Sequence, residues 1–181
     1  MQVTLIGAGN MGSGLPKQLA KAGHQGAILS RDAEQAAELA RQTGSWLFEA
    51  GSDQDASEVV LVATAYADAV DALRQIGDLS GKIIIDITNP LTADYMGLIL
   101  GHSTSAAEEI ARVFPEANLV KVFNTMFAQV LQNGPDFGAG QVVPVCFAGD
   151  NAEAKDVVRA LIESAGFAAV DAGPLKNARY L

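Results

Sequence analysis

The first twelve residues limit the possible folds more than any other stretch, because an apolar run leads directly into closely spaced glycines. Val3 to Ile6 reads VTLI, and this run predicts a buried strand. The glycine-rich segment Gly7-Ala8-Gly9-Asn10-Met11-Gly12 follows at once. Met11 to Ala22 then predicts a helix that ends at Gly23. A strand that turns tightly into a helix is typical of proteins built from βαβ units.

Predicted strands and helices alternate along the remainder of the chain. Further strands are expected at Ala27–Leu29, Trp46–Glu49, Val59–Ala63, Lys82–Thr88, Leu119–Phe123, Val142–Phe147 and Ala168–Val170. Helices are expected at Asp32–Gln42, Ala67–Ile76, Ser105–Val113 and Ala152–Ala165. The segments VVLVA and KIIIDI are apolar at consecutive positions, as strands are when both faces of a parallel sheet are covered. The sequence therefore predicts an α/β fold of the Rossmann type, a doubly wound, mainly parallel sheet with helices on both faces.

Residues 1–181 are expected to form a single domain, because no linker long enough to separate two domains interrupts the alternation. One region does not fit a helix or a strand. Gln129 to Gln141 reads QVLQNGPDFGAGQ, with three glycines and a proline from Gly134 onward. This composition predicts a mobile surface loop.

The glycine spacing in the first turn has a chemical meaning as well as a structural one. It matches G-x-G-x-x-G, and its place between a strand and a helix is the context in which that motif binds a dinucleotide. Gly7 permits the tight turn, Gly9 lets a pyrophosphate approach the backbone, and Gly12 lets the helix pack against the sheet. The free N–H groups at the start of the helix favour an anion.

The residues after the second predicted strand indicate which dinucleotide binds. In NAD-binding proteins an acidic residue about 20 positions beyond the glycines bonds the ribose 2′-hydroxyl. Here Ser30 and Arg31 stand in that place. A guanidinium offers planar donors that suit a 2′-phosphate, and Asp32 is expected to cap the next helix. These residues predict NADP(H) rather than NAD(H). The alternative is that Arg31 is an ordinary surface side chain.

Composition excludes several classes of function. The net charge is -9, which disfavours binding to nucleic acid and to anionic membrane surfaces. A single cysteine, Cys146, excludes a disulfide within the chain, and with only two histidines no metal site is expected. No apolar run is long enough to span a bilayer, and the amino terminus lacks a signal-peptide pattern. A cytoplasmic protein is therefore expected.

Four segments and the last residues of the chain go beyond a generic dinucleotide-binding pattern. They are GAGNMGSGL, SRD, IIDITNPL (Ile84 to Leu91) and VKVFNTM (Val120 to Met126), followed by DAGPLKNARYL (Asp171 to Leu181). In this order and spacing the set resembles the family of coenzyme F420-dependent NADP oxidoreductases. That family is itself similar to the NADPH-binding domains of the STEAP metalloreductases. The resemblance covers nearly the whole chain, and VKVFNT and DAGPLKNAR are its most specific parts.

The resemblance implies a site and a reaction. NADPH would lie across the carboxyl ends of the strands, where doubly wound folds bind ligands. Hydride would pass between C4 of the nicotinamide and C5 of the deazaflavin F420, or to a flavin-type partner. Because the two partners carry this chemistry, no catalytic side chain is assigned. The implied binding residues are Gly7, Gly9, Asn10, Met11 and Gly12 for the pyrophosphate, Ser30 and Arg31 for the 2′-phosphate, Ala63, Thr64 and Ala65 beside the ribose and nicotinamide, and Asn89, Pro90, Asn124, Thr125 and Met126 around the reacting rings.

The family differs from this chain at the carboxyl terminus. Its members continue past the last matching segment in a helical extension that helps cover the second cofactor and often makes a dimer. This sequence ends at Leu181, so the extension is expected to be absent. The sequence leaves open whether the chain forms a homodimer. The redox partner is expected to be a small molecule.

Two other functions remain open at this point. An NADPH-dependent reductase of a small carbonyl or imine would need an acid near the nicotinamide and a larger helical domain, and the sequence indicates neither. A module that binds or senses NADPH without chemistry would keep the glycine loop and Arg31 but would lack a cleft for a second ring.

Two charged residues fall inside predicted strands. Asp86 is expected to be a hydrogen-bonded structural carboxylate, because a buried charge needs partners. Lys121 is expected to be an ordinary solvated lysine, and the alternative is a lysine that faces a phosphate or a strand edge.

Overall fold

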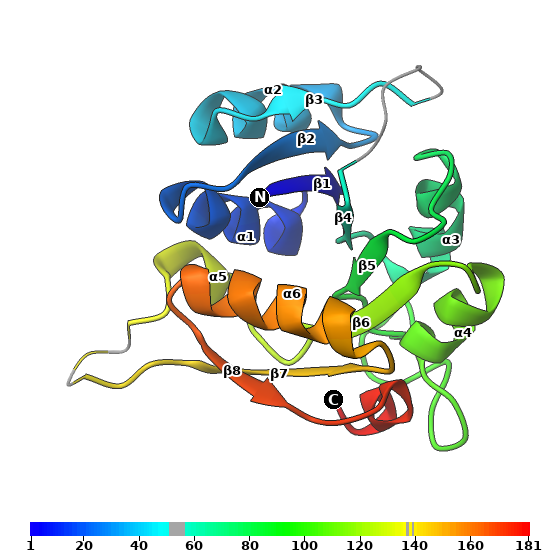
Figure 1. Cartoon of the computed structure of the whole chain (residues 1–181). Coiled ribbons are helices and arrows are strands. Elements are labelled where there is room, and N and C mark those ends of the chain that lie inside the picture. Colours follow the sequence, from blue (N-terminus) through cyan, green and yellow to red (C-terminus); the bar gives the residue numbers. More distant parts are fainter. Residues whose placement is uncertain (51–56, 137, 139) are drawn as a thin grey trace.

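The computed structural model describes residues 1–50, 57–136, 138 and 140–181, and its strands form one sheet (Figure 1). The strands are β1 Gln2–Ile6, β2 Gln25–Leu29, β3 Trp46–Leu47, β4 Val59–Val62, β5 Ile83–Asp86, β6 Asn118–Val122, β7 Pro144–Gly149 and β8 Ala168–Asp171. They lie in the order β3-β2-β1-β4-β5-β6-β7-β8. The chain thus begins in the interior of the sheet, builds outward to β3, and then returns to build the other side from β4. This reversal is the switch point of a doubly wound fold.

Neighbouring strands in the described sheet are parallel, with one exception. The strands β6 and β7 run antiparallel, with Lys121 opposite Ala148, whereas each of the other pairs is parallel. The predicted fold class, a mainly parallel Rossmann-type sheet, is confirmed.

Helices cover both faces of the sheet. Two separate clusters of buried apolar side chains assign each helix to a face. One face carries α1 Asn10–Lys21, α2 Ala33–Thr43, α5 Ala128–Asn133 and α6 Ala152–Ser164, and the other carries α3 Tyr66–Arg74, α4 Ala106–Val113 and the short 3-10 helix η1 Leu175–Tyr180.

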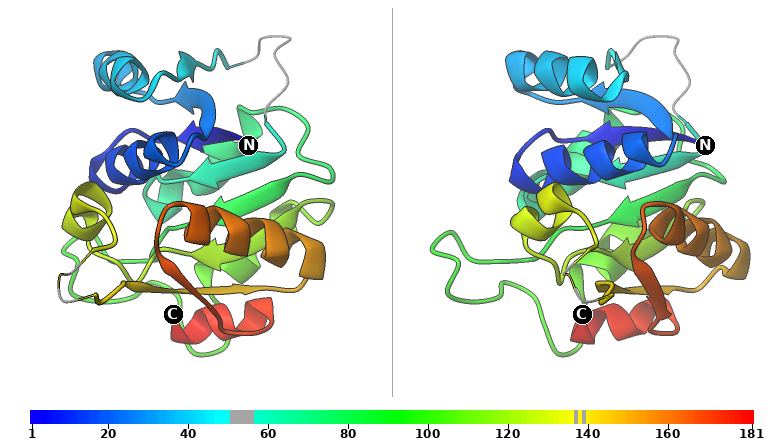
Figure 2. Two further views of the ribbon diagram at one scale, coloured as in Figure 1. Left: turned by 60° about the vertical axis from the view of Figure 1, so that its left-hand side comes forward. Right: turned by 90° about the vertical axis from the view of Figure 1, so that its left-hand side faces the viewer.

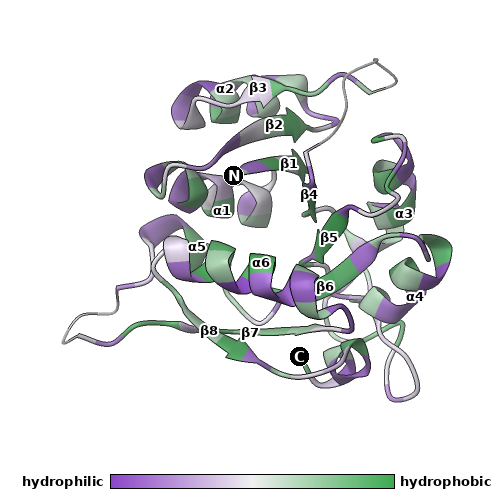
Figure 3. Cartoon of the chain, in the orientation of Figure 1, coloured by the Kyte–Doolittle hydropathy of each residue, from purple (hydrophilic) through white to green (hydrophobic). Residues whose placement is uncertain are grey.

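The strand β4 shows why the sequence favours this layering. Val59 and Leu61 belong to one apolar cluster, while Val60 and Val62 belong to the other. Side chains of a strand alternate between the two faces of a sheet, so an unbroken apolar run needs cover on both. Each such side chain contributes about 1.5–3 kcal/mol when it is fully buried. Figure 3 shows the same pattern, with hydrophobic strands in the middle of the molecule and hydrophilic stretches along the helices.

The prediction of a loop at Gln129–Gln141 is wrong in its first half. Residues Ala128–Asn133 form α5. Two residues of the predicted loop, Phe137 and Ala139, lie outside the described residues. Leu131 is fully buried, and Gln18 on α1 donates a hydrogen bond to the Leu131 carbonyl over 2.8 Å. Six residues are too few to form a stable helix alone, so the packing against α1 decides the structure here. No local pattern indicates that packing.

The parallel strands bring several loops to one edge of the sheet. The carboxyl ends of β1, β2, β4, β5 and β6 share this edge, because these strands are parallel to one another. The segment between β5 and α4 starts there and projects from the body of the molecule in the right-hand view of Figure 2. This edge carries the residues that the sequence predicts for ligand binding.

Candidate functional site

The glycine loop joins β1 to α1, and its three motif glycines have different surroundings. A Cβ on Gly12 would lie 2.0 Å from the carbonyl oxygen of Gly7. Gly7 has a φ of +99°, and its Cβ would lie 2.7 Å from the carbonyl oxygen of Ala63. A Cβ on Gly9 would meet nothing within 4 Å. Gly7 and Gly12 are therefore needed for the turn itself, whereas the space beside Gly9 is open to a ligand.

Helix α1 begins at this open space without a cap. Gly9 is the N-cap residue, no side chain in the described part of the chain caps the helix, and its first turn has no acidic residue. The helices α2, α4 and α6 are capped by the side chains of Asp32, Ser105 and Asn151, whereas α3 and α5 also begin without a side-chain cap among the described residues. The uncapped end leaves N–H groups and the positive end of the helix dipole free for an anion such as a pyrophosphate.

A first cleft extends from the glycine loop to the end of β2. Seven of the predicted residues line it, namely Gly7, Gly9, Ser30, Arg31, Ala63, Thr64 and Ala65.

The carboxylate of Asp32 accepts a hydrogen bond of 3.0 Å from the backbone N–H of Gln35. This contact confirms the prediction that Asp32 caps the second helix.

Arg31 has a partner that the sequence did not indicate. Its Nη2 lies 2.8 Å from Oδ2 of Asp68, which belongs to the first turn of α3 and also lines the first cleft. The Arg31 side chain is 83% exposed. A guanidinium has five N–H donors, and Asp68 accepts from only one of its nitrogens, Nη2. Among the described residues, the remaining donors of this guanidinium have no partner, so they can bind a phosphate.

A second cleft begins where the first ends and extends to the ends of β5 and β6. Both clefts are lined by Ala63, Thr64 and Ala65. The predicted residues Asn10, Met11, Asn89, Asn124 and Met126 also line the second cleft. Three predicted residues, Gly12, Pro90 and Thr125, line neither cleft. The two clefts together bring most of the predicted residues to one continuous surface.

A buried ion pair lies beneath the second cleft. Lys121 and Asp86 are neighbours in the parallel register of β6 and β5, and Nζ lies 2.9 Å from Oδ2, with side chains 3% and 0% exposed. Lys121 also donates to the carbonyl of Thr88, whose N–H donates to Oδ1 of Asp86 over 2.9 Å. The prediction of a solvated Lys121 is wrong, while the prediction of a structural Asp86 is confirmed. Together the pair fixes the backbone of Thr88.

The residues after β5 and β6 are tied to each other. Asn89 donates through Nδ2 to the Asn124 carbonyl, and Asn124 donates through Nδ2 to Oδ1 of Asn89, both over 3.0 Å. Phe123, just before Asn124, has a φ of +62°, a conformation that costs a bulky residue of the order of 1–3 kcal/mol. Its ring is fully buried and packs edge-on against Phe167 at 6.1 Å. Tertiary packing therefore holds the strained turn that presents Asn124.

Two oxygens in this region have no hydrogen-bond partner. Among the described residues, Oγ1 of Thr88 and Oδ1 of Asn124 are buried and unpaired, and both residues line the second cleft. An unpaired buried oxygen costs about 1–3 kcal/mol. A ligand with an amide group, such as a nicotinamide, has the donors that such oxygens lack, so the residues present fit this group.

Tyr66 lines the second cleft and has an ionisable hydroxyl. Partial burial raises the pKa of its hydroxyl, and the carboxylates of Glu109 and Asp86 raise it further. The phenol therefore stays protonated at neutral pH and is a hydrogen-bond donor rather than a base.

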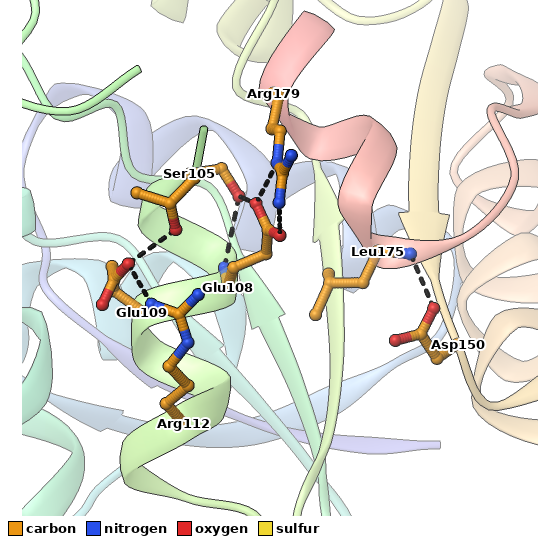
Figure 4. Close-up of polar contacts among 8 residues, drawn as sticks. Ser105, Glu108, Glu109, Arg112, Asp150, Leu175 and Arg179 are labelled. Atoms are coloured by element: carbon orange, nitrogen blue, oxygen red, sulfur yellow. Dashed lines mark hydrogen bonds and ion pairs between the residues drawn. The ribbon is translucent and has the colours of Figure 1, made fainter. Parts of the chain in front are cut away.

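The carboxyl-terminal motif fastens η1 to α4 and lines neither cleft. Arg179 points at Glu108 (Figure 4), with Nε and Nη2 at 2.8 and 2.6 Å from its two carboxylate oxygens. This guanidinium holds the pKa of Glu108 below its usual value. Ser105 donates to the same carboxylate over 2.9 Å, and the backbone N–H of Leu175 donates to Asp150 over 2.8 Å. These contacts join η1 to α4 and to Asp150.

The described residues contain neither a cluster of metal-ligating side chains nor a helix that could span a membrane. No group of three or more His, Cys, Asp or Glu side chains is arranged to hold a metal ion. No helix in the same part of the chain has the length and apolar character that a membrane span requires.

Comparison with known proteins identifies relatives of this chain. The family described as NADP oxidoreductase, coenzyme F420-dependent, matches residues 2–90. The F420-dependent NADP reductase of Methanothermobacter marburgensis is 28% identical over 202 residues, covering 100% of this chain and 88% of that protein. A crystal structure assigned to an F420-dependent NADP reductase of Arthrobacter sp. FB24 is 31% identical, with a TM-score of 0.82, and the match covers 98% of this chain and 87% of that one.

A second group of relatives is much longer than this chain. Metalloreductase STEAP3 of Rattus norvegicus is 32% identical over 179 residues, which are 98% of this chain but 35% of that protein. The chain therefore spans about a third of this relative. The Arthrobacter structure, in contrast, is 31% identical, and the match covers 98% of this chain and 87% of that one. On this basis, the chain belongs to the family of coenzyme F420-dependent NADP oxidoreductases.

Proposed function

We propose that the protein binds NADP(H) along the two clefts and exchanges hydride with a second flat redox molecule, the deazaflavin F420 or a flavin. One observation carries the proposal. A continuous cleft at the carboxyl ends of the parallel strands joins Arg31 to Asn124, with the uncapped start of α1 between them. A dinucleotide has its anionic centre between two heterocyclic ends, which is the same arrangement.

The residues of the cleft divide by the part of NADP(H) they would contact. In this proposal Gly7, Gly9, Asn10, Met11 and Gly12 form the pyrophosphate loop, and Ser30 and Arg31 bind the 2′-phosphate at what we call the adenosine end. Ala63, Thr64 and Ala65 lie beside the ribose and the nicotinamide. Asn89, Pro90, Asn124, Thr125 and Met126 surround the rings at what we call the nicotinamide end. The whole described chain would act as one NADP-binding unit.

In this reaction the protein places the two reacting rings against each other and encloses them. NADP(H), when bound, supplies the hydride chemistry, which needs no acid or base from the protein. The Asp86–Lys121 pair and the Asn89–Asn124 contacts hold the nicotinamide end in one geometry. Near-contact placement of two reacting rings supplies a large part of a rate enhancement.

Exposed apolar side chains at the rim of the nicotinamide end favour a flat partner with an apolar face. The segment after β5 exposes Tyr95 and Met96, which are 78% and 85% exposed, together with Leu98 and Ile99. Tyr95 and Ile99 also line the second cleft. Large apolar side chains that remain exposed beside a cleft are typical of a binding surface.

Oxidation of NADPH, followed by the loss of its absorbance, tests the proposal. F420, FMN, FAD and a ferric chelate are each offered as acceptor. Turnover with F420 or a flavin is the expected result. Tight NADPH binding without turnover on any acceptor would contradict hydride exchange and favour a module that senses NADPH.

A second function, reduction of a small carbonyl or imine, has one observation in its favour. Tyr66 lines the nicotinamide end with a hydroxyl that stays protonated, and such a reduction needs a proton donor near the nicotinamide. The same assay with small aldehydes and cyclic imines distinguishes the two. Activity on these substrates that is lost in Tyr66→Phe would establish the second function.

A further inference from the structure

The partner of Arg31 carries an inference that goes deeper into the proposed NADP(H) site. The Arg31–Asp68 contact joins the end of β2 to the first turn of α3 and lies in the cleft assigned to the adenosine end. The 2′-phosphate of NADPH would bind the same guanidinium that Asp68 already binds. NADH has no such phosphate.

The position of Asp68 in its helix does not by itself explain this contact. A carboxylate in the first turn of a helix interacts favourably with the helix dipole, and that accounts for an acidic residue there. A second α3 carboxylate, Asp71, lines the same cleft, but it pairs with Arg74 of its own helix over 2.9 Å. Asp68 pairs instead with Arg31, which belongs to the opposite wall.

The balance of charge in this cleft is acidic. Among the described residues that line it, Arg31 is the only cation, while Asp32, Asp68 and Asp71 are carboxylates. Asp32 is engaged in capping α2 and Asp71 in its pair with Arg74. Asp68 is therefore the carboxylate that acts directly on Arg31.

Both effects of Asp68 on a bound 2′-phosphate are unfavourable. It occupies a donor of the guanidinium, and it repels a phosphate that carries a larger negative charge than its own. With side chains 83% and 42% exposed, the pair is a weak, solvent-screened one, so a phosphate displaces it at a modest loss. We propose that Asp68 competes with the 2′-phosphate for Arg31 and thereby limits the preference for NADPH over NADH.

Dissociation constants measured by titration calorimetry test this proposal, which rests on the proposed binding of NADP(H). NADPH and NADH are titrated into the wild type, Asp68→Asn and the matched control Asp71→Asn. We expect Asp68→Asn to tighten NADPH binding by about two- to fivefold, the size of an exposed charge interaction, with NADH changed less. The control should shift the NADPH-to-NADH ratio less than Asp68→Asn does. Added salt should reduce the difference between wild type and Asp68→Asn.

Three results would overturn the proposal. An unchanged or smaller NADPH preference in Asp68→Asn would mean that the carboxylate only positions Arg31. An equal shift in Asp71→Asn would mean that the general acidity of the cleft is responsible. If Arg31→Ala weakens NADPH and NADH equally, the assignment of the 2′-phosphate itself fails. That last result distinguishes a failure of the proposed function from a failure of the role of Asp68.

Discussion

The adenosine end and the nicotinamide end of the cleft each contain an ion pair, and the two pairs differ in burial. Arg31 and Asp68 meet in the open, with side chains 83% and 42% exposed. Lys121 and Asp86 are 3% and 0% exposed, and both also bind the backbone of Thr88. An exposed pair contributes about 0–1 kcal/mol, whereas removing one partner of a buried pair costs about 3–5 kcal/mol. The proposed coenzyme choice thus rests on contacts that exchange easily, and the proposed ring placement on contacts that do not.

The glycine loop between the two ends gives the largest expected effect. Gly9→Val should abolish the binding of both NADPH and NADH, because its side chain fills the space beside the uncapped end of α1. The melting temperature should change little, since nothing lies within 4 Å of a Cβ at this position. Calorimetric titration and a thermal melt measure the two properties.

Gly12→Val is the control for that change. Its Cβ would lie 2.0 Å from the carbonyl oxygen of Gly7, so this variant should lose stability as well as binding. Coenzyme binding retained in a folded Gly9→Val protein would mean that the loop holds something other than a pyrophosphate.

The buried pair should give the next largest effect, on stability. Lys121→Met should lower the free energy of unfolding by about 3–5 kcal/mol, because Asp86 would remain buried without its cation. Denaturant unfolding measures this loss, and Lys176→Met, at an exposed lysine, serves as the control. A loss below about 1 kcal/mol, the size of an exposed pair, would remove the contrast between the two ends.

Arg31→Ala should have a smaller effect, and only on binding. NADPH affinity should fall by about 1–3 kcal/mol, the range of a charge-assisted contact. NADH affinity and the melting temperature should stay nearly constant, because Arg31 is exposed and its contact with Asp68 is weak. Titrations of both coenzymes measure the difference. A large drop in melting temperature would show that the adenosine end is part of the scaffold too.

Local sequence predicted most of the fold, since each element of the βαβ pattern shows itself within a few residues. Apolar runs such as Val59–Val62 need two covered faces, and the context of Gly7 to Gly12 needs a strand before and a helix after. The two main errors concern partners distant in the sequence. Lys121 is buried by a pairing with Asp86, 35 residues away, and α5 is stabilised by Gln18 and its neighbours on α1, more than 100 residues away.

The candidate site divides in the same way. The sequence identified Arg31 as a binding residue because the residue that contacts the ribose lies at the end of the second strand, about 20 residues after the glycine motif. Asp68 lies 37 residues further on and is one of two acidic residues on α3, so its link to Arg31 depends on the fold. Thr88 has no distinguishing sequence signal, because only the structure shows that its hydroxyl is unpaired.

That hydroxyl provides the smallest and most discriminating prediction. Thr88→Val keeps the shape of the side chain and removes the unpaired oxygen, so the ligand-free protein should gain about 1 kcal/mol of unfolding free energy. If the oxygen serves the nicotinamide, NADPH affinity should fall, while the affinity for 2′-phospho-ADP-ribose, which lacks that ring, should not. Chemical denaturation and titration with both ligands measure these changes. Equal affinities before and after the substitution would mean that the oxygen is merely an imperfection of packing, and the nicotinamide end would then rely on Asn124 alone among its unpaired groups.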